Sequence, residues 1–108
     1  MYKRSALLAV SLIAAFIFQP AAAAETRITW HGHATFEVVT PKGAVLLIDP
    51  WLNNPKNPQG GQSTDMVESL KRADYILLTH AHTDHIGDAT AIAEKTGAQL
   101  VAMPELGR

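Results

Sequence analysis

The most informative stretch of the sequence is residues 79–85, which read Thr79-His80-Ala81-His82-Thr83-Asp84-His85. They directly follow the apolar run 75–78, whose length and polar borders are typical of a buried strand. The histidines and the aspartate therefore lie where a strand ends and a loop begins. In α/β sheets this carboxyl end of a strand is where ligands are usually held. We expect an α/β fold with a ligand site at residues 80–85.

The side chains of this stretch are of the kinds that bind divalent metals. His80 and His82 are two residues apart, so in extended backbone they point to the same side. Asp84 adds an oxygen ligand, and His85 begins the turn into the following helix. Three neutral imidazoles and one carboxylate suit Zn²⁺, with Mn²⁺ as the alternative ion. Four donors so close together fit two ions better than one, although a pair of exposed histidines can also arise by chance.

Composition narrows the kinds of site and partner. The chain has 108 residues, no cysteine and a formal net charge of -1. A disulfide framework and a thiolate metal site are therefore both excluded. No basic run occurs outside the extreme N-terminus, so nothing in the composition favours a nucleic acid as partner.

The first 24 residues have the layout of a secretory signal peptide. Residues 3–4 are basic, residues 6–18 are apolar, and small residues follow Pro20. The pattern Ala22-x-Ala24 fits the cleavage rule and predicts a mature chain of residues 25–108. An uncleaved membrane anchor is the alternative, but the apolar run is shorter than the roughly 20 residues that a spanning helix needs. An exported chain without cysteine is compatible with a bacterial periplasm.

Three strands are expected in the first part of the mature chain. Residues 27–31 alternate polar and apolar side chains, as a half-buried strand does. Residues 35–40 form the second strand, and a turn at 41–43 leads to the third. Residues 44–48 are continuously apolar, which predicts a strand covered on both faces. The short connections predict an antiparallel meander.

The second part of the chain predicts a βαβ unit. A short helix is expected at residues 65–72, and the strand 74–79 then leads into the histidine-rich stretch. Asp88 is placed to cap the next helix, and Gly97 is placed to end it. Residues 99–103 form the last strand, and this order implies parallel pairing with a right-handed crossover.

Several other polar features remain open from the pattern alone. Asp49 follows the strand 44–48 and is either a turn acid or a group near the metal. His31 and His33 are by default structural histidines with satisfied hydrogen bonds. All five histidines nevertheless fall within residues 31–33 and 80–85, which random scatter seldom gives. The loop 53–62 is either a plain surface connection or a lid or wall beside a substrate.

Three blocks of sequence together resemble one branch of the metallo-β-lactamase superfamily. The blocks are Trp30-His31-Gly32-His33-Ala34-Thr35-Phe36, then Leu47-Ile48-Asp49-Pro50-Trp51-Leu52, and then the string from His80 to His85. That branch holds metal-dependent hydrolases related to ascorbate-phosphate lactonases and to the N-acyl-phosphatidylethanolamine phospholipase D. The resemblance runs from Arg27 to the C-terminus, and it implies that His33 and Asp49 line the site behind the metal ligands.

The resemblance implies a hydrolytic mechanism. His80 and His82 would hold a first metal ion, and Asp84 and His85 a second. A metal ion lowers the pKa of bound water to about 7 and polarises a carbonyl or phosphoryl oxygen. Asp84 is also the candidate catalytic residue, because its carboxylate could orient the attacking hydroxide. The implied substrate is an ester, a lactone or a phosphodiester.

The resemblance also implies a specific fold, the αββα sandwich of two half-domains, of which this chain matches the N-terminal half. The later half supplies a histidine, a bridging aspartate and a further histidine, and nothing after Asp88 can be matched to them. We therefore expect residues 25–108 to leave an apolar face uncovered, and either to be unstable alone or to associate through that face, with a second copy or with a complementing C-terminal half. The alternatives to a hydrolase are an exported metal-binding module without catalysis and a truncated gene product without function.

Overall fold

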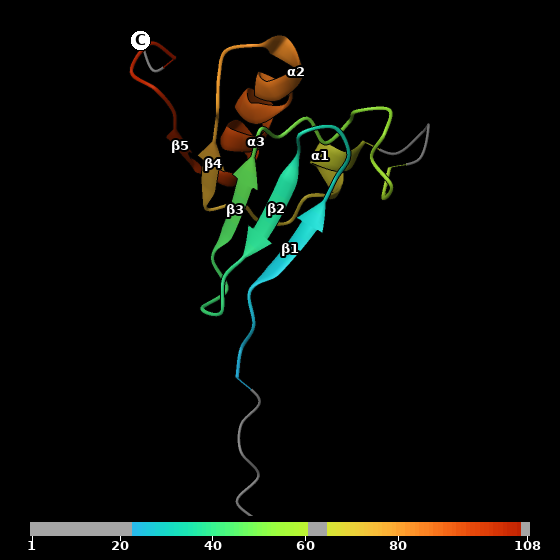
Figure 1. Cartoon of the computed structure of the whole chain (residues 1–108), viewed down its shortest axis with the longest axis vertical. Helices are drawn as coiled ribbons and strands as arrows, with labels where there is room; N and C mark the ends of the chain where they lie inside the picture. The colour runs from blue at the N-terminus through green and yellow to red at the C-terminus, as the bar shows by residue number, and fades with distance from the viewer. Residues whose placement is uncertain (1–22, 61–64, 107–108) are drawn as a thin grey trace, which may run out of the picture.

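The computed structural model describes residues 23–60 and 65–106, which form an α/β fold built on one mixed sheet (Figure 1). Its strands are β1 (Arg27–Trp30), β2 (Phe36–Val39), β3 (Val45–Ile48), β4 (Tyr75–Leu77) and β5 (Gln99–Val101). The helices in these ranges are α1 (Met66–Ser69), α2 (Thr83–Ile86) and α3 (Ala89–Thr96). The expected fold class is confirmed, and the strands are somewhat shorter than the sequence predicts.

The strands lie in the sheet in their sequence order, β1-β2-β3-β4-β5. The pairs β1–β2 and β2–β3 are antiparallel, which is the expected meander. The pairs β3–β4 and β4–β5 are parallel, as expected for the βαβ unit. Because β3 and β4 run in the same direction, the loops that follow them start at the same edge of the sheet. The backbone N–H of Asp49 accordingly donates to the carbonyl of Leu77 at 2.9 Å.

Two aspartates occupy helix N-caps but act differently. The carboxylate of Asp65 accepts from the backbone N–H groups of Val67 and Glu68 and begins α1, as predicted, although this helix ends at Ser69 rather than at residue 72. Asp88 occupies the N-cap position of α3, as predicted, but its side chain makes no cap hydrogen bond to this helix. Its carboxylate instead accepts from the backbone N–H of Asn53 at 3.0 Å. Asp88 thus joins the loop after β3 to the start of α3.

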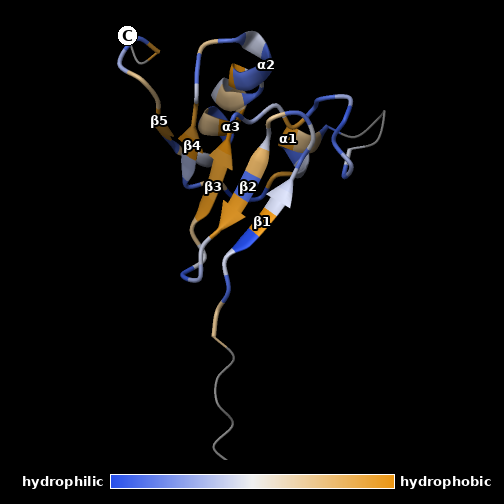
Figure 2. Cartoon of the chain, viewed as in Figure 1, coloured by the Kyte–Doolittle hydropathy of each residue, from blue (hydrophilic) through white to orange (hydrophobic). Residues whose placement is uncertain are grey.

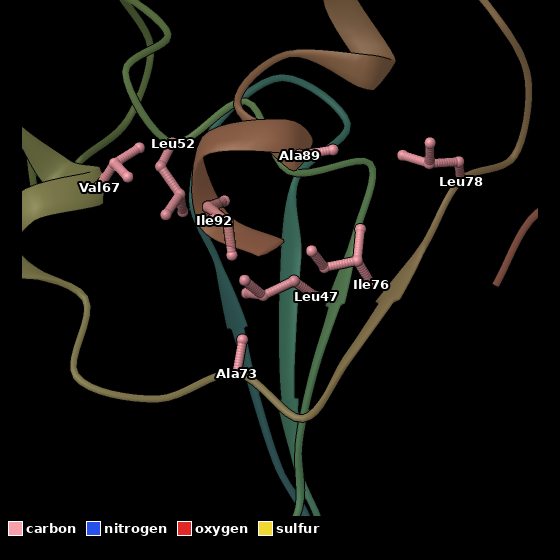
Figure 3. Close-up of a cluster of buried hydrophobic side chains, with 8 residues drawn as sticks. All are labelled: Leu47, Leu52, Val67, Ala73, Ile76, Leu78, Ala89 and Ile92. Atoms are coloured by element: carbon pink, nitrogen blue, oxygen red, sulfur yellow. The ribbon is translucent and has the colours of Figure 1, made fainter. Parts of the chain in front are cut away.

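The hydrophobic core lies between the sheet and the helices α1 and α3. Leu47 of β3, Ile76 of β4 and Ile92 of α3 are fully buried, and their side chains converge in Figure 3. Leu52 and Val67 extend the same cluster toward α1. Complete burial of one such side chain stabilises a fold by about 1.5–3 kcal/mol. This core fixes β3 and β4 side by side and so positions the loops that follow them.

The opposite face of the sheet is apolar and is not covered by the described residues. The strand register aligns one row across all five strands, made by Trp30, Phe36, Ile48, Leu77 and Val101. Trp30 is 47% exposed, Phe36 38% and Val101 47%. Figure 2 shows how apolar the central strands are. We name the side of the sheet that carries this row the open face.

The open face corrects one prediction about β3. Leu47 is completely buried, but its neighbours Leu46 and Ile48 on the other side of the strand are only partly covered. The prediction that this strand is covered on both faces is therefore wrong for the described part of the chain. The expectation of an uncovered apolar face agrees with the structure.

The described ranges contain no helix with the length and apolar character needed to cross a membrane. The predicted signal peptide, residues 1–24, falls almost entirely outside the described residues and stays a prediction.

Candidate metal centre

The histidine-rich stretch lies beyond the carboxyl end of β4. This strand ends at Leu77, the next residues bend, and α2 begins at Thr83. The helix α2 is one four-residue turn that was not predicted, because so short a segment carries no helical repeat of apolar residues. Asp84 and His85 are therefore part of a helix, whereas the sequence pattern predicts that His85 begins the turn into the following helix. Figure 1 shows α2 beyond the end of β4.

Asp49, at the end of β3, is the buried anchor of this region and is only 3% exposed. Its Oδ1 accepts from the backbone N–H of Thr79 at 2.8 Å, and its Oδ2 accepts from the Thr79 hydroxyl at 2.6 Å. The same Oδ2 lies 2.8 Å from Nδ1 of His85. Burial raises the pKa of Asp49, but the hydrogen bonds from Thr79 and His85 outweigh it and hold the pKa below its ordinary value. Asp49 is therefore a carboxylate at neutral pH.

This carboxylate sets the orientation of the His85 ring. An ionised carboxylate only accepts hydrogen bonds, so Nδ1 of His85 carries the proton and donates it to Asp49. In a neutral imidazole with this tautomer, the lone pair for a metal ion is on the other ring nitrogen, Nε2. It lies 3.9 Å from Oδ2 of Asp84. A carboxylate behind a histidine is the arrangement that orients many metal-binding imidazoles.

His33 reaches the same place from the loop between β1 and β2. Its Nε2 lies 3.2 Å from Oδ2 of Asp84, and its ring stands edge-on to the rings of Trp51 and His85, with centroids 5.5 Å away in both cases. The backbone φ is +50° at His33 and +43° at Asp49, and these are the non-glycine residues with positive φ in the described part of the chain. Strained residues of this kind concentrate at functional sites.

His80 and His82 also lie together. Their ring centroids are 4.6 Å apart, which agrees with the expectation that both rings lie on one side of the backbone. The His80 ring is 4.0 Å from the His85 ring, and its Nδ1 lies 2.9 Å from the Thr79 hydroxyl. The His80 ring thus lies next to the rings of both His82 and His85.

Among the described residues, two sets of three side chains have ligand atoms within 4.8 Å of one another. One set is His33, Asp84 and His85, and the other is Asp49, His80 and His85. His82 belongs to neither set. Both groups for which the sequence left a role open, His33 and Asp49, are therefore brought to the predicted site.

The fifth histidine has a different place. His31 is 9% exposed, and within the described residues neither of its ring nitrogens has a hydrogen-bond partner. The nearest carboxylate oxygen, in Glu37, lies 3.9 Å from Nε2, which is too long for a hydrogen bond. Within the described part of the chain, the default interpretation of His31 as a structural histidine with satisfied hydrogen bonds is therefore wrong.

Thr35 supports the site but was not identified from the sequence. It is fully buried, its hydroxyl donates to the backbone carbonyl of Asp49 at 2.8 Å, and it accepts from the backbone N–H of Trp51 at 2.9 Å. A threonine beside an expected strand has no distinguishing signal in the sequence. Only its complete burial shows that it joins the loop after β1 to the loop after β3.

The loop after β3 packs on the turn that carries His33. Gly32 has a φ of +84°, and a Cβ there would lie 2.5 Å from the carbonyl carbon of Lys56 and 2.6 Å from both the side chain of Asn54 and the backbone nitrogen of Asn57. Asn54 and Asn57 are buried, and the Asn54 amide donates to the carbonyl of His31 at 2.8 Å. The described part of the expected loop 53–62 is thus a packed wall that holds residues 31–33 in place.

A hollow of about 290 Å³ opens beside Asp84 and is bordered by Trp51, Thr83 and Gly87. Position 87 requires a glycine because its backbone packs directly against Trp51. A Cβ at this position would lie 2.6 Å from the Cβ of Trp51. The carboxylate of Asp84, whose side chain is 43% exposed, is accessible to a small molecule.

The fold and the donor set define an α/β protein with a divalent-metal type of site at the carboxyl ends of parallel strands. Residues 28–108 match the family model of the metallo-beta-lactamase superfamily, and the chain belongs to this superfamily. The resemblance of its three sequence blocks to this superfamily is thereby confirmed.

Relatives of the chain carry consistent names. A UPF0173 metal-dependent hydrolase of Anaeromyxobacter sp. (strain K) is 53% identical over 90 residues, which are 82% of this chain and 31% of the relative. One from Thermodesulfovibrio yellowstonii is 54% identical over 83 residues, which are 77% of this chain and 30% of the relative. The structure of Igni18, a metallo hydrolase from the archaeon Ignicoccus hospitalis, matches with a TM-score of 0.64 and 36% identity over 76% of this chain and 34% of that one. The chain thus spans about a third of the length of these relatives.

Proposed function

We propose that this chain supplies the N-terminal, metal-binding part of a metal-dependent hydrolase that acts on an ester, a lactone or a phosphodiester. One observation carries the proposal. The buried carboxylate of Asp49 fixes His85 through Nδ1 and leaves Nε2 free beside Asp84, with the His80 ring next to it. We further propose that the protein is exported to a bacterial periplasm after removal of residues 1–24, because those residues have the pattern of a cleavable leader.

Zinc is the ion that this donor set suits best, with manganese as the alternative. The available donors are imidazole nitrogens and carboxylate oxygens, and the chain has no cysteine. In the proposal, His80 and His82 hold a first ion, while Asp84 and His85 hold a second. The side-by-side rings of His80 and His82 support the first pair, and the free Nε2 of His85 supports the second.

The bound ion would supply a hydroxide at neutral pH and a polarised substrate oxygen. The residues of the chain have separate tasks around it. Asp84 is accessible beside the hollow and can accept a hydrogen bond from the attacking oxygen. Asp49 and Thr79 keep the His85 ring in one orientation, and the hollow of about 290 Å³ can admit a small-molecule substrate.

We also propose that the open face is covered by a complementing polypeptide that corresponds to the rest of the related proteins. The support is the row of partly exposed apolar side chains across all five strands, together with the fact that the chain spans about a third of its relatives. An exposed apolar row of this extent is typical of a surface that another element covers. Self-association through the same face is the competing outcome.

The test of this function uses the zinc-loaded chain alone and mixed with the remaining two thirds of the Anaeromyxobacter relative. Hydrolysis of a nitrophenyl ester, a lactone and a nitrophenyl phosphodiester is followed in each sample. We expect activity in the mixture with at least one substrate class, and its loss in Asp84→Ala. Activity that survives Asp84→Ala would contradict the role of this residue, and a stable zinc-loaded complex that cleaves no substrate would contradict the hydrolase.

A further inference from the structure

We propose, on the basis of the proposed function, that His33 is itself a metal ligand and completes a three-residue site with Asp84 and His85. The resemblance places His33 only behind the ligands, whereas the geometry gives it a ligand position. Donor atoms bound to one tetrahedral zinc lie about 3.3 Å apart, given Zn–N and Zn–O distances of about 2.0–2.1 Å. Oδ2 of Asp84 is 3.2 Å from Nε2 of His33 and 3.9 Å from Nε2 of His85. Both distances are close to those of donors around one ion.

The hydrogen bonds of Asp49 distinguish this set from the alternative set of Asp49, His80 and His85. The two oxygens of Asp49 already accept three hydrogen bonds, two from Thr79 and one from His85. Asp49 is also almost completely buried, so it acts as the orienting group and not as a ligand. It directs the free Nε2 of His85 to the side where Asp84 lies. The accessible set of ligand atoms is therefore the one that contains His33.

The fold holds His33 in this position by several independent contacts. The indole nitrogen of Trp30 donates to the carbonyl of His33 at 3.0 Å, and the ring of Trp51 stands edge-on to the imidazole. Gly32, directly before it, is enclosed by the backbone of the loop after β3. These contacts hold His33 at a φ of +50°, which is uncommon for a residue other than glycine. The backbone of this turn thus presents one imidazole to the accessible side of Asp84.

A site of this composition lies entirely within the described residues. It takes one divalent ion through two nitrogens and one oxygen, and it leaves a fourth position for water or substrate. The chain would then hold this ion without any ligand from a complementing polypeptide. That consequence separates the inference from the two-ion arrangement proposed above, in which Asp84 and His85 act without His33.

The test measures metal binding rather than activity. The 108-residue chain, labelled with nitrogen-15 at histidine, is loaded with a spin-active cadmium isotope, and scalar coupling between cadmium and each imidazole nitrogen is recorded. We expect coupling to Nε2 of His33 and to Nε2 of His85 from the same ion. Zinc affinity is measured in parallel by competition with a chelating dye. His33→Asn keeps a residue that tolerates positive φ and removes the imidazole, so we expect it to weaken binding more than tenfold.

Glu94→Gln is the matched control, since it removes a charged group from the exposed side of α3 without touching the site. It should leave the zinc affinity unchanged. Cadmium coupled to His85 but not to His33, with unchanged affinity in His33→Asn, would overturn the inference and leave the proposed function standing. No bound cadmium or zinc in the unmutated chain would overturn both. The coupling is measured in the unmutated chain, so the test holds even if His33→Asn does not fold.

Discussion

At the scale of single residues, the site depends on positions where the backbone is strained and the side chain compensates. A non-glycine residue with positive φ costs about 1–3 kcal/mol. Asp49 offsets that cost through three hydrogen bonds from Thr79 and His85. A hydrogen bond to a charged group contributes about 1.5–3 kcal/mol. The strain at Asp49 therefore persists because the same residue fixes two segments distant in sequence.

Replacing Asp49 by asparagine tests this role. Asn tolerates positive φ, but its amide lacks the negative charge and can present only one acceptor oxygen. We predict a loss of about 1–3 kcal/mol in the free energy of unfolding, measured in urea without metal. We also predict a 10–100-fold weaker zinc affinity, since the orientation of His85 is lost. The control is Asp88→Asn, which retains an acceptor for the Asn53 N–H. It should reduce the free energy of unfolding and the zinc affinity less than Asp49→Asn does. Equal losses in the two variants would contradict the orienting role of Asp49.

The sequence identified some site residues and missed others for a physical reason. The histidines and Asp84 stand out because metal-binding side chains seldom cluster so densely, and Asp49 stands out because an acid ends an apolar strand. Thr35 and Thr79 do the orienting but look like ordinary strand or loop residues. Their role depends on contacts to Asp49 across 14 and 30 residues of sequence. No local pattern carries that information.

At the scale of elements, Asp74 joins the start of β4 to β3. Its Oδ2 accepts from the backbone N–H of Val45 at 2.7 Å, and its carboxylate pairs with the guanidinium of Arg72. Hydrogen bonds from Arg72 and from Val45 hold the pKa of Asp74 below its ordinary value of 3.8. A carboxylate whose pKa is lowered on folding stabilises the folded state fully above its unfolded pKa. The stabilisation is lost as the pH falls through the lower folded value.

Asp74→Asn should reveal this dependence. We predict that the variant unfolds at lower urea concentration than the unmutated chain at neutral pH. The difference should shrink as the pH falls below 3.8, because protonation removes the same charge from the unmutated chain. Urea unfolding at a series of pH values measures it. A difference that stays constant down to about pH 2 would show that the charge of Asp74 is not the stabilising feature.

Gly32 and Gly43 separate backbone strain from close packing in the turns that flank β2. Both have positive φ, +84° and +85°, but a Cβ at Gly43 would meet nothing within 4 Å. We predict that Gly43→Ala costs about 1–2 kcal/mol from backbone strain alone. Gly32→Ala should cost a further 1–3 kcal/mol or so, because the loop after β3 must move. Urea unfolding of both variants tests this, and equal losses would mean that the loop does not constrain the turn.

The elements were predictable to the extent that they are periodic. The strands and the βαβ unit follow from apolar runs and turn residues, and the structure has all of them. The helix α2 is too short for periodicity, and the carboxylate of Asp88 could pair with either the helix or the neighbouring loop. It accepts from Asn53 because the loop after β3 returns to the start of α3. That return is a tertiary feature, which the helix-cap pattern cannot contain.

At the scale of the whole molecule, the sheet has a packed side and an open side. An apolar strand such as β3 is compatible with cover on both faces, but the sequence of the strand does not say which polypeptide provides the cover. The register shows that Trp30, Phe36 and Val101 lie in one exposed row. Removing such a row from water is favourable by about 25 cal/mol per Å². The chain therefore has a driving force to associate.

We predict that the 108-residue chain alone associates through the open face. Sedimentation velocity should give a weight-average mass that rises with concentration. Val101→Lys places a charge in the row and should shift the distribution toward monomer, whereas Thr90→Lys on the exposed side of α3 should not. A chain that remains monomeric at every concentration, or that responds equally to both substitutions, would contradict the prediction. Addition of the complementing part of a relative should displace the self-association.

We expect the imidazoles of His80, His82 and His85 and the carboxylate of Asp84 to bind a divalent cation beyond β4. Anomalous X-ray scattering at the zinc edge, from crystals of the chain grown with zinc, measures this binding without any assumption about activity. Anomalous density should appear among these four side chains, with the nearest peak within bonding distance of Asp84. Crystals with these side chains ordered and no anomalous density between them would contradict this expectation.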